Sequence, residues 1–355
     1  MWRNIYGHDH LAEYFQTAVA RGRLASTFLF VGPTGVGKHT FARQLAQTLL
    51  CHQRSVERFV PCDMCESCRL FLAGNHPDLH EVRKPEDKSE IPVALLIGDL
   101  TRNMRMKEGF SYEMHLKPYL GNMRVGIIDD ADYLNQEGVN SLLKLLEEPP
   151  PHTAIILISH DVNQQLPTIR SRAQLIRFRP LSTENLRAAL GQTDLAADPA
   201  ALERALQLAN GSVGQALETS HPDFWQFRQR LFASLAKLPL NNVALAREVL
   251  EFVEAAGKEA RDRRPRLIWA MLQTAEFYRH LARALCGQAD TADPTLAAAL
   301  ATAQRQEGWD IEAVLHCAER SLAATEHVER YLNQNILCEA WLEELSVTLS
   351  PVGSA

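Results

Sequence analysis

A glycine-rich segment, GPTGVGK at residues 32–38, constrains the fold of this chain more than any other feature. It follows an apolar run over residues 27–31 and opens a helical pattern over residues 38–50. This is the context of a phosphate-binding loop, because glycines let successive backbone N–H groups face a phosphate, while the helix N-terminus and the lysine add positive charge. We therefore expect four residues to bind nucleotide phosphates: Gly32, Gly35, Gly37 and Lys38.

The residue after the lysine departs from the usual pattern. Phosphate loops place Ser or Thr there, and its hydroxyl binds Mg²⁺, whereas this chain has His39. Mg²⁺ prefers oxygen ligands, so an imidazole is a poor substitute. Thr40 follows, but on a helix it points about 100° further round. With His39 and Thr40 as the residues beside the metal position, the pocket should bind nucleotide without efficient hydrolysis, or bind none.

Polar residues end the next two strand candidates. The apolar run over residues 124–128 leads into Asp129 and Asp130. A carboxylate at the end of a central parallel strand holds a Mg²⁺-bound water in phosphate-loop proteins, which predicts this role for Asp129. Asp130 could polarise an attacking water or simply follow the strand, and Asp132 is predicted to cap the next helix. A later run ends at Ser159, which could sense a γ-phosphate or form a turn.

Four of the seven cysteines cluster within 18 residues of sequence: Cys51, Cys62, Cys65 and Cys68. Their spacing offers four thiolates to a tetrahedral, structural zinc ion that would close a loop too small to have its own core. An iron–sulfur cluster is the alternative, which no electron-transfer motif supports. With four cysteines present, His52 and His76 are expected to be bystanders. The scattered cysteines are predicted to be buried packing residues: Cys286, Cys317 and Cys338.

The chain of 355 residues is too long for one core, and three stretches differ in pattern. To about residue 180, strand-like runs alternate with helical segments, which is typical of a parallel α/β layer. Short helices follow over residues 181–220, one of them capped and started by Asp198-Pro199. After His221-Pro222 the pattern is helical to the end. We therefore expect two or three domains.

Composition limits the functional classes. Hydrophobic residues make up 46% of the chain, but no apolar run approaches the ~18 to 20 residues of a membrane helix, and the first residues lack a secretory signal. These features predict a cytoplasmic protein with reduced thiols. The net charge of −6 argues against sequence-independent DNA binding by the chain alone. A zinc-dependent nucleic-acid-binding protein, one alternative, would need a local basic face.

Together these motifs carry a resemblance to a known family. The carriers are the glycine loop, the four clustered cysteines, residues 125–132, the block NSLLKLLEEPP at residues 140–150 and the segment LPTIRSR at residues 166–172. The combination resembles the bacterial clamp-loader branch of the AAA+ ATPases, and it covers roughly the first 220 residues. The resemblance implies a hetero-pentameric ring of gamma/tau-, delta- and delta-prime-type subunits that places a sliding clamp on primed DNA, within the DNA polymerase III holoenzyme.

The resemblance also implies an α/β fold in three parts. These are a RecA-like AAA+ P-loop domain over residues 1–180 with a zinc module inserted at residues 51–75, a helical lid over residues 181–220, and an all-α collar for oligomerisation over residues 221–355. The expected cofactors are a structural zinc ion and ATP with Mg²⁺.

Within this branch, gamma/tau-type subunits hydrolyse ATP and delta-prime-type subunits assist them. Two departures favour the assisting role: His39, and Gly214 at the lid position that normally carries an arginine facing the γ-phosphate. The resemblance makes Arg172 a finger donated to a neighbouring ATPase subunit, although Ala173 stands where the family usually has cysteine. The alternative is a gamma/tau-type subunit that hydrolyses MgATP itself, with Asp130 activating the water.

Overall fold

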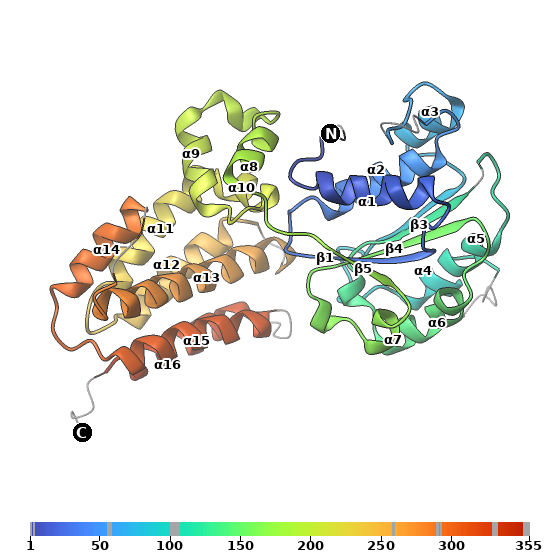
Figure 1. Cartoon of the computed structure of the whole chain (residues 1–355). Coiled ribbons are helices and arrows are strands. Elements are labelled where there is room, and N and C mark those ends of the chain that lie inside the picture. Colours follow the sequence, from blue (N-terminus) through green and yellow to red (C-terminus); the bar gives the residue numbers. More distant parts are fainter. Residues whose placement is uncertain are drawn as a thin grey trace. The chain divides into compact units, whose positions relative to one another are not determined.

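The computed structural model describes residues 2, 4–54, 59–99, 107–121, 123–257, 260–288, 291, 293–328 and 333–350. The chain forms two compact units, Met1–Glu218 and Thr219–Ala355. The first unit holds the sheet and the glycine loop, and the second is helical in its described part (Figure 1). The first unit thus combines the stretches predicted as AAA+ domain and lid, whose separation into two domains stays a prediction.

A five-stranded parallel sheet forms the centre of the first unit. Its order is β2-β3-β4-β1-β5. The strands are β1 (Thr27–Val31), β2 (Leu79–Val82), β3 (Arg124–Ile128), β4 (Thr153–Ser159) and β5 (Gln174–Arg177). Every residue of β1, β3 and β4 is buried, because helices cover both faces, and this is why these strands read as continuous apolar runs. The strands predicted over residues 27–31, over residues 124–128 and up to Ser159 are confirmed as β1, β3 and β4; the half-polar β2 was not predicted.

Helices lie on both faces of this sheet (Figure 1). Helices α1 and α2 cover one face over an aromatic cluster that includes Phe15, Phe30 and Phe41, and α4 to α6 cover the other. The bounds are α1 (Asp9–Ala20), α2 (Lys38–Leu50), α3 (Glu66–Leu72), α4 (Val93–Ile97), α5 (Phe110–His115), α6 (Gln136–Glu147), α7 (Pro167–Arg170), α8 (Thr183–Leu190), α9 (Pro199–Leu208) and α10 (Val213–Thr219), with short 3₁₀ turns η1 (Ala131–Tyr133), η2 (Val162–Gln164) and η3 (Asp194–Ala197).

Local sequence signals predicted two helix starts correctly and one incorrectly. The predicted start of α2 at Lys38 and the cap of α9 by Asp198, which accepts from two backbone N–H groups, are confirmed. The prediction that Asp132 caps the next helix is wrong. The cap of α6 is Asn135, whose Oδ1 accepts from the N–H of Gly138 at 2.8 Å. Asp132 lies in η1 instead, and its carboxylate accepts hydrogen bonds from beyond β4.

The described part of the second unit consists of helices around one apolar core: α11 (Pro222–Leu235), α12 (Asn242–Glu254), α13 (Ala260–Leu285), α14 (Pro294–Gln304), α15 (Ile311–Val328) and α16 (Gln334–Thr348). Cys317 and Cys338 are buried in this unit, as predicted, but Cys286 is exposed. That prediction is wrong because Cys286 lies just beyond the end of α13. No helix in the described part of the chain has the length and apolar character that spanning a bilayer requires.

Candidate functional site

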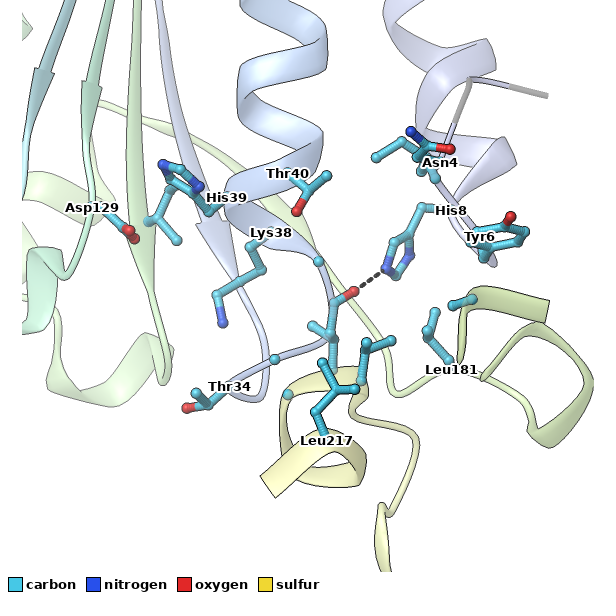
Figure 2. Close-up of a pocket in the computed structure, with 18 of the residues that line it drawn as sticks. Asn4, Tyr6, His8, Thr34, Lys38, His39, Thr40, Asp129, Leu181 and Leu217 are labelled. Atoms are coloured by element: carbon cyan, nitrogen blue, oxygen red, sulfur yellow. Dashed lines mark hydrogen bonds between the residues drawn. The ribbon is translucent and has the colours of Figure 1, made fainter. Parts of the chain in front are cut away.

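A cavity of about 640 Å³ lies at the carboxyl end of β1 in the first unit. This volume falls within the range of small-molecule and cofactor sites. One end is lined by the N-terminal segment, including Tyr6 and His8, and by Leu181 and Leu217; the middle is lined by the glycine loop; the other end carries the acidic residues after β3 (Figure 2). The predicted phosphate loop therefore opens into a cavity of suitable size for a nucleotide.

The glycine loop has the backbone that a phosphate cradle requires. Gly35 and Gly37 have φ values of 74° and 96°, a region that side chains with a Cβ rarely adopt. Lys38 is only 5% exposed, and its Nζ donates to the carbonyls of Gly32 at 2.5 Å and Pro33 at 2.8 Å. Burial lowers the pKa of Lys38 from 10.5 to about 8, against the opposing effect of nearby carboxylates.

The segment that precedes α10 packs directly on the glycine loop. The N–H of Val213 donates to the carbonyl of Gly35 at 3.0 Å. A Cβ at Gly35 would lie 2.3 Å from Oγ of Ser212 and 2.9 Å from the backbone nitrogen of Gly214. A Cβ at Gly214 would in turn lie 3.2 Å from Cα of Gly35. Gly214, the position where a lid arginine was predicted to be lost, thus packs its backbone closely against the glycine loop.

The residues beside the expected Mg²⁺ position do not fit that ion. His39 turns toward β2, where its Nε2 lies 3.7 Å from Oε1 of Glu81. Thr40 is exposed and points away from Lys38 on another side of α2 (Figure 2). Mg²⁺ demands near-octahedral oxygen ligands at about 2.0–2.1 Å, and phosphate-loop proteins supply one from the hydroxyl after the lysine. This chain lacks that hydroxyl. The carboxylate of Asp129, the other group predicted on the metal side of the site, already faces a cation.

This cation is Arg83, which the sequence analysis missed. Its Nε lies 3.2 Å from Oδ2 of Asp130 and 3.7 Å from Oδ2 of Asp129. On the other side, Nε2 of His160 lies 3.8 Å from Oδ1 of Asp130, and its Nδ1 lies 3.2 Å from Oγ1 of Thr34. Arg83 directly follows β2, so its position at the carboxyl edge of the sheet would have been the signal, had this half-polar strand been recognised.

Ser159, the predicted γ-phosphate sensor, does not line the cavity, although its neighbours Ile158 and His160 do. Its side chain is fully buried, and its Oγ lies 2.6 Å from Oδ1 of Asp132 and 2.9 Å from the carbonyl of Asp161. The Asp132 carboxylate also accepts from the N–H of His160 at 2.7 Å. These bonds fix the end of β4, and thereby hold His160 at the cavity.

The four clustered cysteines meet in space. Their sulfurs all lie within 4.8 Å of one another, with 4.0 Å between Cys51 and Cys65 and 4.0 Å between Cys62 and Cys68. Zn–S bonds of about 2.3 Å in a tetrahedron place sulfurs about 3.8 Å apart. Backbone N–H groups also point at the sulfurs, such as that of Cys65 at Cys62, 3.3 Å away. The cluster therefore has the geometry to hold a metal ion.

The two nearby histidines have other partners. His76 is 5% exposed, and its Nε2 lies 2.9 Å from Oγ of Ser67. Nε2 of His52 lies 3.0 Å from the carbonyl of Leu120. Their predicted role as bystanders to the cysteine cluster agrees with these contacts.

The predicted arginine finger, Arg172, forms its ion pair with Glu147 rather than with Asp129 or Asp130. Its Nη2 and Nε donate to Oε1 of Glu147 at 2.5 and 3.0 Å, and its Nη1 donates to the carbonyl of Thr168 at 2.9 Å. Glu147 ends α6 and is 48% exposed at its side chain, against 30% for Arg172. Arg172 is thus held at the surface by a partner from its own chain.

The strand order, with the glycine loop after β1 and the acidic pair after β3, defines a P-loop domain of the AAA+ type. A family model described as DNA polymerase III, delta subunit, matches residues 7–182. Over residues 7–182 this chain is therefore similar to the clamp-loader subunits of DNA polymerase III.

Relatives of two types share this similarity. DNA polymerase III subunit gamma/tau of Mycobacterium tuberculosis is 35% identical over 188 residues, which are 53% of this chain and 30% of that protein. Subunit delta' of Bacillus subtilis is 34% identical over 209 residues, 58% of this chain and 57% of the relative. Subunit delta' of Escherichia coli is 31% identical over 215 residues, 61% of this chain and 60% of the relative. The matches therefore span less than two thirds of these relatives.

Proposed function

We propose that this chain is a delta-prime-type subunit of the DNA polymerase III clamp loader, which helps to load the sliding clamp onto primed DNA during replication. Its partners would be gamma/tau- and delta-type subunits in a pentameric ring in the cytoplasm, held together through the helices of residues 221–355. Its own site hydrolyses ATP weakly or not at all. Its contribution to chemistry is Arg172, donated to the ATP site of a neighbouring subunit.

The observation that carries this proposal is the altered metal side of the cavity. A competent phosphate-loop ATPase holds Mg²⁺ between a loop hydroxyl and a strand-end carboxylate. Here the loop position is His39, turned toward Glu81, and both carboxylates after β3 face the guanidinium of Arg83. Asp130 is therefore a poor base for an attacking water, because its carboxylate is already engaged by Arg83 and flanked by His160.

Arg172 is available for a role in trans. Its pair with Glu147 is partly exposed, and such ion pairs contribute only about 0.2–1 kcal/mol. An arginine finger, by contrast, contributes a factor of about 10³–10⁵ in turnover. If Arg172 left Glu147 to contact the phosphates of a neighbouring site, the lost ion pair would therefore cost little free energy. The gain in turnover at that site would be much larger.

The cysteine cluster is proposed to hold a structural zinc ion. Four cysteine ligands leave no open position for a substrate. In this role the ion fixes the loop between α2 and α3 and takes no part in nucleotide chemistry.

A gamma/tau-type subunit with its own ATPase is the second candidate, and one observation favours it. The glycine loop and Lys38 keep the geometry of a working phosphate cradle. Turnover by the purified chain distinguishes the two candidates. A delta-prime-type subunit shows negligible MgATP turnover alone, with no further loss in Lys38→Ala, whereas turnover that depends on Lys38 identifies a motor subunit.

The second arm adds a gamma-type partner. Partner turnover should rise when this chain is added, and fall with Arg172→Ala. Arg170→Ala is the matched control, because it removes an exposed arginine from the same segment. Equal losses in both variants, or a loss in neither, would contradict the finger role of Arg172.

A further inference from the structure

We propose that the cavity binds a nucleoside di- or triphosphate without a divalent metal, with Arg83 as the built-in counter-cation. This inference deepens the proposed function and rests on it, because a site that does not hydrolyse ATP has no need of the metal. It assigns the nucleotide a structural role in this subunit. Arg83 is a binding residue here, and takes no part in bond cleavage.

The charges around the cavity set the requirement. Among the described lining residues, the formally charged side chains are Lys38, Arg83, Asp129 and Asp130, whose charges sum to zero. Without Arg83 the net charge of the lining side chains would be −1, and the ligand itself would carry several negative charges. In ordinary phosphate-loop sites Mg²⁺ neutralises the carboxylate side and bridges it to the phosphates. A guanidinium stays protonated at all relevant pH values, so Arg83 provides this compensation permanently.

The position of Arg83 suits this role. Its Nε lies within 4 Å of both carboxylates, 3.2 Å from Asp130 and 3.7 Å from Asp129. Only one of its nitrogens is used in these contacts, and a guanidinium offers five N–H donors in a plane, which match phosphate oxygens. Its side chain is 73% exposed and lines the cavity, so its remaining donors are accessible to a ligand.

A metal would compete with Arg83 for the same oxygens. A divalent cation bound to Asp129 would sit a few ångströms from the guanidinium and would meet like-charge repulsion. It would also lack the loop hydroxyl, because His39 occupies that position and turns to Glu81. Adding Mg²⁺ should therefore bring little affinity to this chain.

The rest of the cavity retains groups for a nucleotide. The ammonium of Lys38 has three donors, of which two are used by loop carbonyls, and the third is open to a phosphate. At the other end, Nε2 of His8 bonds to the carbonyl of Val36 at 2.8 Å (Figure 2). Its Nδ1 is buried and has no hydrogen-bond partner among the described residues.

The test is calorimetric titration of the full chain with ADP and with ATP, in EDTA and in excess Mg²⁺. The wild-type dissociation constants in the two buffers should agree within about threefold. In EDTA, Arg83→Met should weaken binding about tenfold through the loss of one nearby positive charge. In Mg²⁺ the same variant should recover most of that affinity, and His39→Thr/Arg83→Met should depend on Mg²⁺ still more strongly.

Arg43→Met is the matched control. Arg43 pairs with Glu81 at 3.2 Å and does not line the cavity, so its loss should leave both dissociation constants unchanged. Nucleotide binding by the wild type that requires Mg²⁺, or an Arg83→Met variant that binds equally well in EDTA, would overturn the inference. So would a folded wild type that binds neither nucleotide. In those cases the effect of Arg172→Ala on a partner's turnover would still decide the delta-prime assignment independently.

Discussion

Replacing Cys68 by serine should remove the metal from the cysteine cluster while leaving both units folded. Cys68 is fully buried, and its sulfur lies 4.0 Å from that of Cys62. The ideal separation in a zinc–thiolate tetrahedron is about 3.8 Å, so the sulfurs need to move by only a few tenths of an ångström to bind the ion. The site is therefore preorganised, and the loss of one ligand should greatly weaken metal binding.

The magnitude follows from the size of the module. Structural zinc contributes on the order of 10 kcal/mol to small metal-dependent folds, while the module adds few residues to the apolar core, chiefly Phe59 and Phe71. Metal loss should therefore unfold the segment between α2 and α3, and α2 should stay folded because Phe41 and Leu45 pack in the aromatic cluster of the sheet.

Metal analysis of the purified chain and limited proteolysis provide the assay. Wild type should carry one zinc ion per chain, and Cys68→Ser should carry almost none and be cut within residues 51–75. Cys317→Ser is the control, because Cys317 is equally buried but lies in the second unit. Full zinc content in Cys68→Ser would refute the reasoning, and the visible absorption of an iron–sulfur cluster would refute the choice of metal.

Three further predictions concern other parts of the chain. Because the pKa of Lys38 is about 8, its ammonium is charged below this pH and loses its proton above it, so calorimetry should show ATP affinity falling as the pH rises through 8. Asp293→Ala should destabilise the second unit by about 3–5 kcal/mol in chemical denaturation, because Arg228, 1% exposed and 2.5 Å from that carboxylate, would remain buried without it. Asp293→Asn should cost less, since it keeps a polar oxygen there. Gly35→Ala should force the loop away from Ser212, 2.3 Å from the new Cβ, and raise proteolysis at residues 209–214; unchanged protection would contradict the close packing.

Much of the fold followed from local sequence because its signals are local. Continuous apolar runs predicted β1, β3 and β4, since a parallel strand covered on both faces has no polar face to show. The glycine loop and the start of α2 were equally clear, because positive φ values and a helix N-terminus have distinct residue requirements. The edge strand β2 was missed because none of its residues is fully buried: three are half-buried and one is exposed.

The candidate site was only partly predictable. His39 could be recognised as a departure from its place in a motif, but its contact with Glu81 depends on the neighbouring strand. Asp132 read as a helix cap and proved to anchor the end of β4 through Ser159 and His160. Cys286 read like the other scattered cysteines, yet a position one residue beyond a helix decides its exposure.

The sequence by itself determined the resemblance to clamp-loader subunits, the phosphate loop and the four cysteines, because each depends on residue types at fixed spacing along the chain. Only the tertiary structure brought Arg83 to Asp129 and Asp130, which are 46 and 47 residues further along. Parallel strands that are distant in sequence end at one edge of the sheet, and the side chains that meet there set the local charge. That charge, rather than the glycine motif, determines whether the site needs a metal.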